Sequence, residues 1–516
     1  MTIPRVLYLW FVLFLVIGSS TAFAQEDGAT NDTVHEVDGS AEEVMESTED
    51  ADHAVQDATA EEGDHEEGYG GGHAKVLPPL WLVAPFVILL LMIATGPLFY
   101  GHHWHHHYPK YAVGLGLFVT VYYLFVLHDG ISMLHALQEY LSFIALVASL
   151  FIAASGIFLK VNARGTPLAN ISLLSVGAVV ANLIATTGAA MLFIRPYMRL
   201  NRGRLKAYHI VFFIFIVANV GGAMTPIGDP PLFLGFLRGV PFFWTAAHVW
   251  HIWVPTLIVL LAIFYVMDSR NKAKSTTDIS SGKTIELQGN RSFIFVVIIV
   301  VSVFIDPNVI TAMKGTPFDL VGTYHLPFGI REIIMFSMCV LAFKCCDQEA
   351  LKKNEFTFEP IREVGWLFLG IFACMVPALA LISNYAAENA SVLTATTFYW
   401  GTGTLSGVLD NAPTYLNFLA AAMGKFGMDI NNAVEVKAFA NADASMLYLS
   451  AISIAAVFFG AMTYIGNAPN FMVKAIAESN GADVPSFVGY LVKYGLTILL
   501  PVYAVVWLVF YSGWIF

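Results

Sequence analysis

The stretch GAMTPIGDPP (residues 222–231) recurs later in the chain as GAMTYIGNAP (residues 460–469). The two copies agree at seven of ten positions, and each follows a long apolar run with polar residues at its centre. Agreement in order, spacing and context indicates an internal duplication. We therefore expect two related halves, repeat 1 at about residues 131–267 and repeat 2 at about residues 364–516.

Both copies place glycine and proline in the middle of an apolar segment, within residues 209–237 and 444–474. Unsatisfied backbone groups in hydrocarbon are costly, so a broken helix persists there only where it faces protein or a water-filled cavity. The topology deduced below gives the two copies opposite orientations across the membrane. Inverted repeats with discontinuous helices are typical of secondary transporters whose site lies near the midplane. The simpler alternative is a proline kink that binds nothing.

The composition excludes an ordinary cytosolic enzyme and predicts an all-α polytopic membrane protein. Of 516 residues, 57% are hydrophobic and only 12% are charged, against roughly a quarter charged in soluble domains. About ten apolar runs are long enough to be read as transmembrane helices. They cover residues 80–99, 111–127, 131–159, 209–237, 244–267, 293–306, 327–343, 364–384, 444–474 and 487–516.

Two further runs are predicted to be re-entrant hairpins rather than spans. Residues 167–197 are apolar, with Lys160 and Arg164 before them and a basic cluster, 195–206, after them. A single span would place one basic flank on the wrong side, whereas a hairpin that enters and leaves from the cytoplasm keeps both inside. Residues 387–422 carry polar residues and proline at their centre, and their flanks are poor in basic residues. We expect this second hairpin to enter from the opposite face.

The net charge of −12 combines two unlike parts. Residues 25–74 hold seventeen acidic residues and no lysine or arginine, which leaves the rest of the chain at 26 basic and 21 acidic residues, or +5. With ten spans, two hairpins and an external amino terminus, nineteen lysine and arginine residues fall inside and six outside, and Arg5 leaves with the predicted signal peptide. This distribution follows the positive-inside rule.

The amino terminus is predicted to be a signal peptide, residues 1–24. Arg5 precedes a short apolar run, which ends in small residues and the pattern Ala22-Phe23-Ala24. Residues 25–76 form an acidic, histidine-containing segment that we expect to be disordered and periplasmic. It acts either as a solvated spacer or as a cation collector. Residues 77–516 are then the transporter domain, in a bacterial inner membrane with the mature amino terminus in the periplasm.

Two carboxylates are expected to carry the function. An ionised carboxylate at the bilayer centre costs at least ~2.5 kcal/mol, so Asp229 in the first broken helix and Asp410 at the tip of the second hairpin are functional candidates. Amide and hydroxyl oxygens surround them in the sequence, and oxygen ligands suit hard cations. The supporting ligands are predicted to be Thr225, Asn411, Thr463 and Asn467, and the family resemblance described below adds Asn219. The tip of the first hairpin is predicted at Thr186, Thr187 and Gly188.

The sign of these charges favours a cation as substrate. A citrate or succinate site must neutralise two or three negative charges, yet the motifs themselves contain no lysine or arginine, and Arg195 lies toward the cytoplasmic arm of its hairpin. A carboxylate that holds either a proton or a metal ion is the simplest exchanger, because the two ligands compete for one site. The paired hairpins disfavour a channel.

The chain also has a histidine cluster, made of His102, His103, His105, His106 and His107. It is able to chelate a metal or to sense pH near neutrality, or it serves as a polar anchor beside the membrane. An intramembrane metal-dependent enzyme is disfavoured, because no H-E-x-x-H or similar motif is present. No resident metal or cofactor is expected.

These motifs resemble those of a known family. Thr186-Thr187-Gly188, the stretch from Asn219 to Pro230, and Leu409-Asp410-Asn411-Ala412-Pro413 resemble the NhaD-like sodium/proton antiporters, especially the branch labelled "putative citrate transporter" or "sodium:proton antiporter", within the ion transporter superfamily. The resemblance implies two inverted repeats, a homodimer and an ion site that includes Asn219, Thr225, Asp229, Asp410 and Asn411. Two departures are present, since Pro231 and Leu232 replace the usual threonines, and Thr186 and Thr187 replace an expected acidic pair.

The resulting hypothesis is a secondary active transporter that exchanges Na+ (or Li+) for H+, and not an enzyme. The alternative is a sodium- or proton-coupled citrate or dicarboxylate symporter. Expected partners are the lipid bilayer, small inorganic cations and a second copy of the chain, with no nucleic acid.

Overall fold

A computed structural model describes residues 77–276 and 285–513. All described residues belong to one compact unit. The predicted signal peptide and the acidic segment, residues 1–76, therefore lie outside the described residues.

Most of the described chain is helical, which confirms a mostly helical, polytopic membrane protein. Eight helical segments in it are long and apolar enough to cross a membrane. They are η1–α2 (Leu80–Pro97), α4 (Gly130–Ser155), α5 (Pro167–Leu200), α6–η2 (Ala207–Met224), α8 (Trp244–Ser269), α13 (Glu359–Glu388), α17–η4 (Asp443–Met462) and α19–η5–α20 (Phe487–Phe510).

The remaining helices are shorter or more polar, and a small sheet joins two loops. The helices are α3 (Gly101–Phe125), α7 (Pro230–Arg238), α9 (Asn290–Ser302), η3 (Thr311–Met313), α10 (Leu320–Tyr324), α11 (Ile330–Cys345), α12 (Gln348–Lys353), α14 (Ala395–Val408), α15 (Asn411–Lys425), α16 (Ala433–Asn441) and α18 (Ala468–Ser479). Of the expected spans, three correspond to α3, α9 and α11. Because α9 has 13 residues and α11 has 16, against about 20 for a typical span, the count of ten spans stays a prediction.

Helix α5 folds back on itself instead of running straight. Its backbone leaves the helical region at Ile184 and Ala185, and Ala185 has a φ of 64°. A straight helix of 34 residues would be about 51 Å long. Yet Asn170 and Asn201, near its two ends, exchange side-chain hydrogen bonds of 2.9 and 2.7 Å. The two arms therefore form a helical hairpin with its tip at Ala185.

Helices α14 and α15 form a second hairpin. The chain turns at Leu409 and Asp410, and the rings of Phe398 and Phe418, one on each arm, lie 6.2 Å apart. The Asp410 side chain caps α15 by accepting a hydrogen bond from the Ala412 amide at 3.0 Å. An aspartate N-cap followed closely by Pro413 is a sequence pattern that starts a helix.

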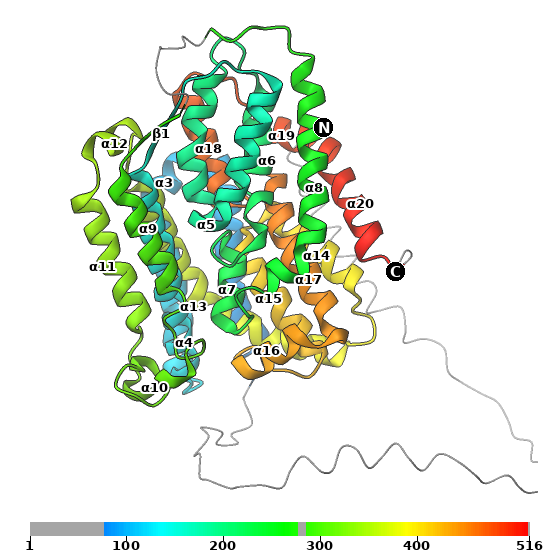
Figure 1. Cartoon of the computed structure of the whole chain (residues 1–516). Helices are drawn as coiled ribbons and strands as arrows, with labels where there is room; N and C mark the ends of the chain where they lie inside the picture. Colours follow the sequence, from blue (N-terminus) through cyan, green and yellow to red (C-terminus); the bar gives the residue numbers. More distant parts are fainter. Residues whose placement is uncertain (1–76, 277–284, 514–516) are drawn as a thin grey trace, which may run out of the picture. The chain divides into compact units, whose positions relative to one another are not determined.

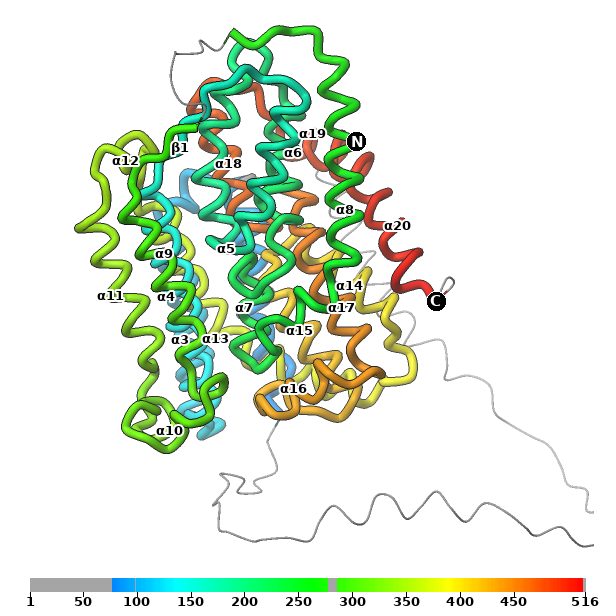
Figure 2. The backbone as a smooth tube through the Cα atoms, in the orientation of Figure 1, coloured from blue at the N-terminus to red at the C-terminus, as the bar shows by residue number. Residues whose placement is uncertain are grey.

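The open ends of the two hairpins lie at opposite ends of the bundle. The basic loops lie around the open end of the first hairpin. There, strand β1 (Phe158–Val161) pairs antiparallel with β2 (Ile285–Gln288), and Arg195 forms a 3.0 Å ion pair with Glu355. At the other end, Arg238 at the end of α7 contacts Asn431 before α16. Figures 1 and 2 show α6 and α18 in one half of the bundle and α7, α15 and α16 in the other.

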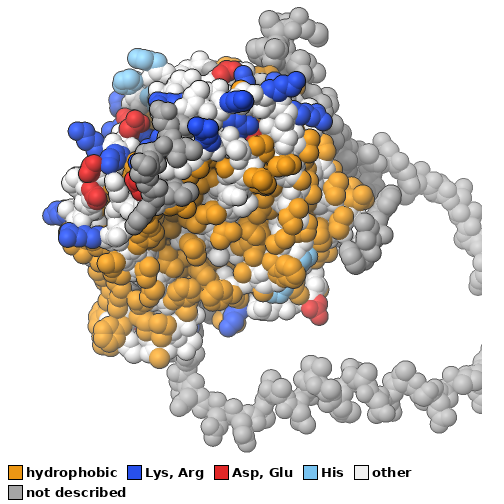
Figure 3. Space-filling view, turned by 45° about the horizontal axis from the view of Figure 1, so that its top comes forward, with side chains coloured by type: hydrophobic (Ala, Val, Ile, Leu, Met, Phe, Trp, Pro, Cys, Tyr) orange, Lys and Arg blue, Asp and Glu red, His pale blue; other side chains and the backbone are white. Residues whose placement is uncertain are grey.

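The surface between these ends is apolar. Figure 3 shows lysine and arginine side chains gathered along one end, above a broad region of hydrophobic side chains. Leucine, valine and isoleucine side chains of several helices are freely exposed, such as Leu117 of α3, Ile258 of α8 and Val297 of α9, each at 59%. Exposed apolar area on this scale requires a lipid environment.

Candidate ion-binding site

The two copies of the motif adopt the same backbone course. In each, a helix gives way to a 3-10 turn, η2 (Val220–Met224) or η4 (Gly460–Met462), and then to an extended threonine, Thr225 or Thr463. A new helix begins one residue after Asp229 in the first copy and after Asn467 in the second. Each new helix has a proline in its first turn. Backbone N–H groups in the first turn of a helix have no acceptor within the helix, so a proline, which lacks this group, fits there without the loss of a hydrogen bond.

The tip of each hairpin docks on the neighbouring break through one equivalent hydrogen bond. The Thr186 amide donates to the Gly228 carbonyl at 2.8 Å, and the Asn411 amide donates to the Gly466 carbonyl at 3.1 Å. Gly228 and Gly466 occupy matching positions in the two copies. In each break, one carbonyl that the interrupted helix leaves without its usual partner is therefore satisfied by protein, as a break within a membrane requires.

Asp229 lies where both hairpin tips and both breaks meet. Its side chain is 1% exposed. The carboxylate accepts hydrogen bonds from the Thr186 hydroxyl at 2.8 Å, the Asn467 amide at 2.8 Å and the Asn411 amide at 2.7 Å. These three donors come from the first hairpin, the second break and the second hairpin. The structure thus brings four of the predicted site residues into one contact group.

None of the hydrogen-bond donors found for Asp229 among the described residues is positively charged. Asp268 at the end of α8 provides the comparison, because it is also fully buried but is held by Arg204 at 2.8 Å. A buried carboxylate without a cationic partner is costly unless it is protonated or holds a metal ion. The charge of an ionised Asp229 is therefore not balanced by any of its hydrogen-bond partners among the described residues.

Asparagines extend the site beyond Asp229. The Asn467 amide also reaches Asn219 Oδ1 at 3.2 Å, and Asn219 Nδ2 donates to Asn470 Oδ1 at 2.6 Å. Asn470 in turn donates to the carbonyls of Gly460 and Thr463 at 2.8 and 2.9 Å. Sequence reasoning missed Asn470, although it stands three residues after Asn467 and hence one turn along the same helix.

The predicted ligand threonines have a different role in this state. The Thr225 hydroxyl donates to the Asn182 carbonyl at 2.6 Å, and Asn182 Oδ1 accepts from the Met224 amide at 2.9 Å. The Thr463 hydroxyl accepts from the Gly466 amide at 3.2 Å. The hydroxyls of both threonines therefore form hydrogen bonds that stabilise the two breaks, and the assignment of these threonines as ion ligands stays a prediction. Asn182 is a second residue that sequence reasoning missed.

One amide oxygen in the group is left without a donor. Asn411 Oδ1 is buried and accepts no hydrogen bond from the described residues, while Nδ2 of the same side chain binds Asp229. A buried acceptor without a partner requires an explanation such as an ion or a water. Asp410, the preceding residue, is half-buried and is adjacent in the chain to a residue that contacts Asp229.

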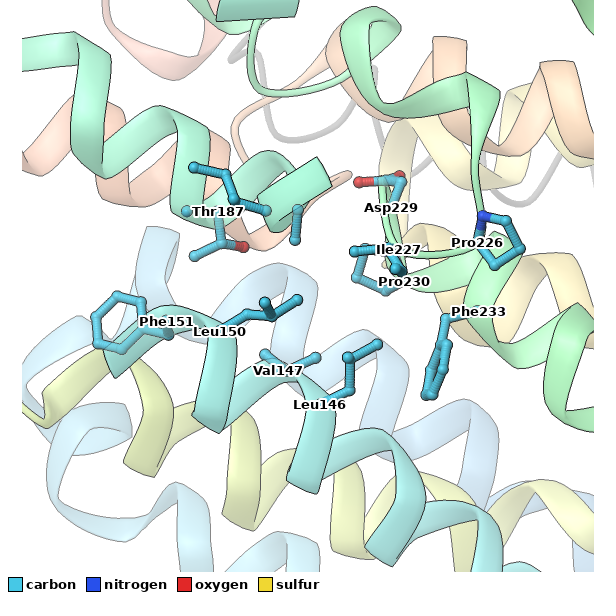
Figure 4. A pocket seen from close by; sticks show the side chains of 13 residues that line it. Leu146, Val147, Leu150, Phe151, Thr187, Pro226, Ile227, Asp229, Pro230 and Phe233 are labelled. Carbon is cyan, nitrogen blue, oxygen red and sulfur yellow. The ribbon is translucent and has the colours of Figure 1, made fainter. Parts of the chain in front are cut away.

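A cavity of about 20 Å³ lies beside Asp229. Figure 4 shows Thr187 across from Asp229, with Leu146, Val147 and Leu150 of α4 on a third side. This volume corresponds to one water molecule. Gly188 also lines the cavity. Thr187 and Gly188 of the hairpin tip therefore border this cavity and do not hydrogen-bond to the Asp229 carboxylate.

The matched family model, described as "Putative citrate transport", covers residues 75–511 and therefore every residue of this site. The chain belongs to that family. Comparison with curated proteins gave no significant match. Together with the eight membrane-spanning candidates, membership in this family makes the chain a multi-pass membrane transporter of the secondary type and not an enzyme.

The close packing of the first break leads to a testable prediction about stability. A Cβ on Gly228 would overlap the Gly222 carbonyl oxygen and lie 3.0 Å from Asn182 Oδ1. We expect Gly228→Ala to lose about 3 kcal/mol of stability and to lower the melting temperature of the purified protein. Gly114→Ala is the control, because a Cβ there meets nothing within 4 Å. Equal melting temperatures in both variants would show that the break can widen.

Proposed function

We propose that this protein exchanges Na+ (or Li+) for H+, with Asp229 and Asp410 as the carboxylates that bind the ions. The observation that carries the proposal is the unpaired Asn411 Oδ1 next to a buried Asp229 that has no cationic partner among the described residues. Carboxylate and amide oxygens are ligands that hard cations prefer. The cation would bind the deprotonated form, and a proton would replace it.

Competition follows from the environment of Asp229. The hydrogen bonds from Thr186, Asn411 and Asn467 stabilise the carboxylate but add no positive charge. One monovalent cation or one proton supplies the missing charge, and both together would overcompensate it. Binding of one therefore releases the other, which is the basis of antiport.

The equivalent contacts in the two halves support inverted repeats. Each half has a hairpin whose tip donates to a glycine carbonyl in a broken helix, and the hairpins open at opposite ends of the bundle. We propose that both hairpins are re-entrant and that residues 131–267 and 364–516 are repeats of opposite orientation. Placement in a bacterial inner membrane, a periplasmic amino terminus and a homodimer are carried forward as parts of the same proposal.

Sodium- or proton-coupled symport of citrate or a dicarboxylate is the alternative, and the family description favours it. Two observations count against it. A polycarboxylate needs positive charge around it, but Arg195 pairs with Glu355 among the basic loops, outside the Asp229 contact group. The cavity beside Asp229 has room for about one water and not for a molecule of citrate.

Transport assays in inverted membrane vesicles distinguish the two functions. A pH gradient, acidic inside, is imposed and followed with a fluorescent amine dye while Na+, Li+ or K+ is added. We expect Na+ or Li+ to dissipate the gradient, and vesicles without the protein serve as the control. Uptake of labelled citrate is measured in parallel. If citrate uptake is robust and no monovalent cation dissipates the pH gradient, the antiport proposal is wrong and the symport function takes its place.

A further inference from the structure

The histidine cluster lies at the start of α3, away from Asp229. Four of its members, His102, His103, His105 and His106, are exposed. His105 lies near Glu363 of α13 and Arg362 interacts with Tyr108, so the cluster is close to the beginning of α13. Nothing in the proposed exchange mechanism uses these side chains.

Two pairs of histidines in the cluster have a spacing at which both side chains of a pair can bind one metal ion. His102 and His106 are four residues apart with ring centroids 4.9 Å apart, and His103 and His107 repeat that spacing at 4.3 Å. Side chains four apart share one face of a helix. Two imidazoles on one face can therefore bind the same ion.

The backbone fixes the tautomer of one ring in each pair. His106 Nδ1 lies 2.9 Å from the His102 carbonyl, and His107 Nδ1 lies 3.0 Å from the His103 carbonyl. Because a carbonyl can only accept, Nδ1 carries the proton and the lone pair resides on Nε2. A ring nitrogen that donates to a carbonyl, with the other free, is the usual state of a metal-binding histidine.

The two pairs differ in how free they are to bind an ion. His103 Nε2 already pairs with the Tyr111 hydroxyl at 2.8 Å, and its ring stacks on His107 at an interplanar angle of 12°. The rings of His102 and His106 are inclined by 32° and both are exposed. The pair His103/His107 is thus committed to Tyr111, whereas His102 and His106 can turn toward a common ligand.

We propose that His102 and His106 form a binding site for a divalent transition-metal ion such as Zn2+ or Cu2+. Imidazole nitrogen is a ligand these ions prefer over Na+ or Mg2+, so this site is separate from the oxygen site at Asp229. No group of three histidine, cysteine or acidic side chains in the described part of the chain could hold a metal ion. Water completes the coordination, and the bound ion exchanges readily.

Zn2+ titration of the purified full-length protein by calorimetry tests the site. We expect His102→Ala/His106→Ala to weaken Zn2+ binding at least tenfold and to lower the number of nitrogen couplings in the Cu2+ EPR spectrum. His103→Ala/His107→Ala is the matched control, since it removes two histidines of the same spacing and should keep the affinity. Melting temperatures establish that both variants are folded.

Wild-type affinity in His102→Ala/His106→Ala would overturn the proposal. An equal loss in the two double variants would also overturn it, because it would show unspecific binding by the whole cluster. Histidines elsewhere in the chain contribute the same background to every titration, so the difference between the two variants reports on the site itself.

Discussion

Asp229→Asn is expected to abolish dissipation of the pH gradient by Na+ or Li+. The substitution keeps the shape of the side chain but removes the charge that a cation and a proton compete for. The fold should persist, because Asn467 already occupies the matching position of the second break, with a similar backbone conformation, and asparagine starts helices as well as aspartate does. The vesicle assay with a fluorescent amine dye measures the effect.

Asp443→Asn is the matched control for this prediction. Asp443 is exposed at the start of α17, so its loss should leave exchange within about twofold, as surface substitutions usually change little. Exchange at the wild-type rate in Asp229→Asn would remove this carboxylate from the mechanism. It would also leave the unpaired oxygen of Asn411 without the role assigned to it.

The sequence predicted the breaks better than it predicted the contacts across them. The glycines and prolines of residues 222–231 and 460–469 indicated where the helices stop, because local backbone chemistry decides that point. The basic residues on both sides of residues 167–197 indicated a chain that returns to the same end, and the Asn170–Asn201 hydrogen bonds show the fold-back.

Contacts over long sequence separations could not be read from the motifs. Asn411 and Asp229 are 182 residues apart, and Asn467 and Asp229 are 238 apart. Each was a candidate for its own polar chemistry, but no local pattern states which oxygen or amide faces which. Thr225 illustrates the limit, because its hydroxyl points to the Asn182 carbonyl and not to the carboxylate four residues later.

Helix boundaries were the other source of difference. Apolarity alone placed the expected spans at 293–306 and 327–343, whereas α9 ends earlier, at Ser302, and α11 begins later, at Ile330. Asp306 at the end of the first run pairs with Arg331 at 2.8 Å. This pair joins the segment after α9 to the first turn of α11, and periodicity does not reveal such a contact.

Asp410→Asn is expected to reduce exchange at least tenfold while the fold and the melting temperature stay unchanged. Asp410 has two possible roles, as the N-cap of α15 and as a carboxylate beside Asp229. Asparagine preserves the first role, because its amide oxygen can accept the Ala412 hydrogen bond as aspartate does. It removes the second role, because the side chain can no longer take up or release a proton. Transport and thermal unfolding measured on the same preparation therefore separate the two.

Asp410→Ala completes this test. Losing an N-cap costs about 1 kcal/mol, so the alanine variant should melt at a lower temperature than the asparagine variant and should be equally inactive in exchange. If Asp410→Asn transports normally and only Asp410→Ala fails, Asp410 is a structural cap and Asp229 alone binds the ions. A single carboxylate would then limit the exchanger to one charge held at the site at a time, and the coupling ratio measured in vesicles would have to agree with that limit.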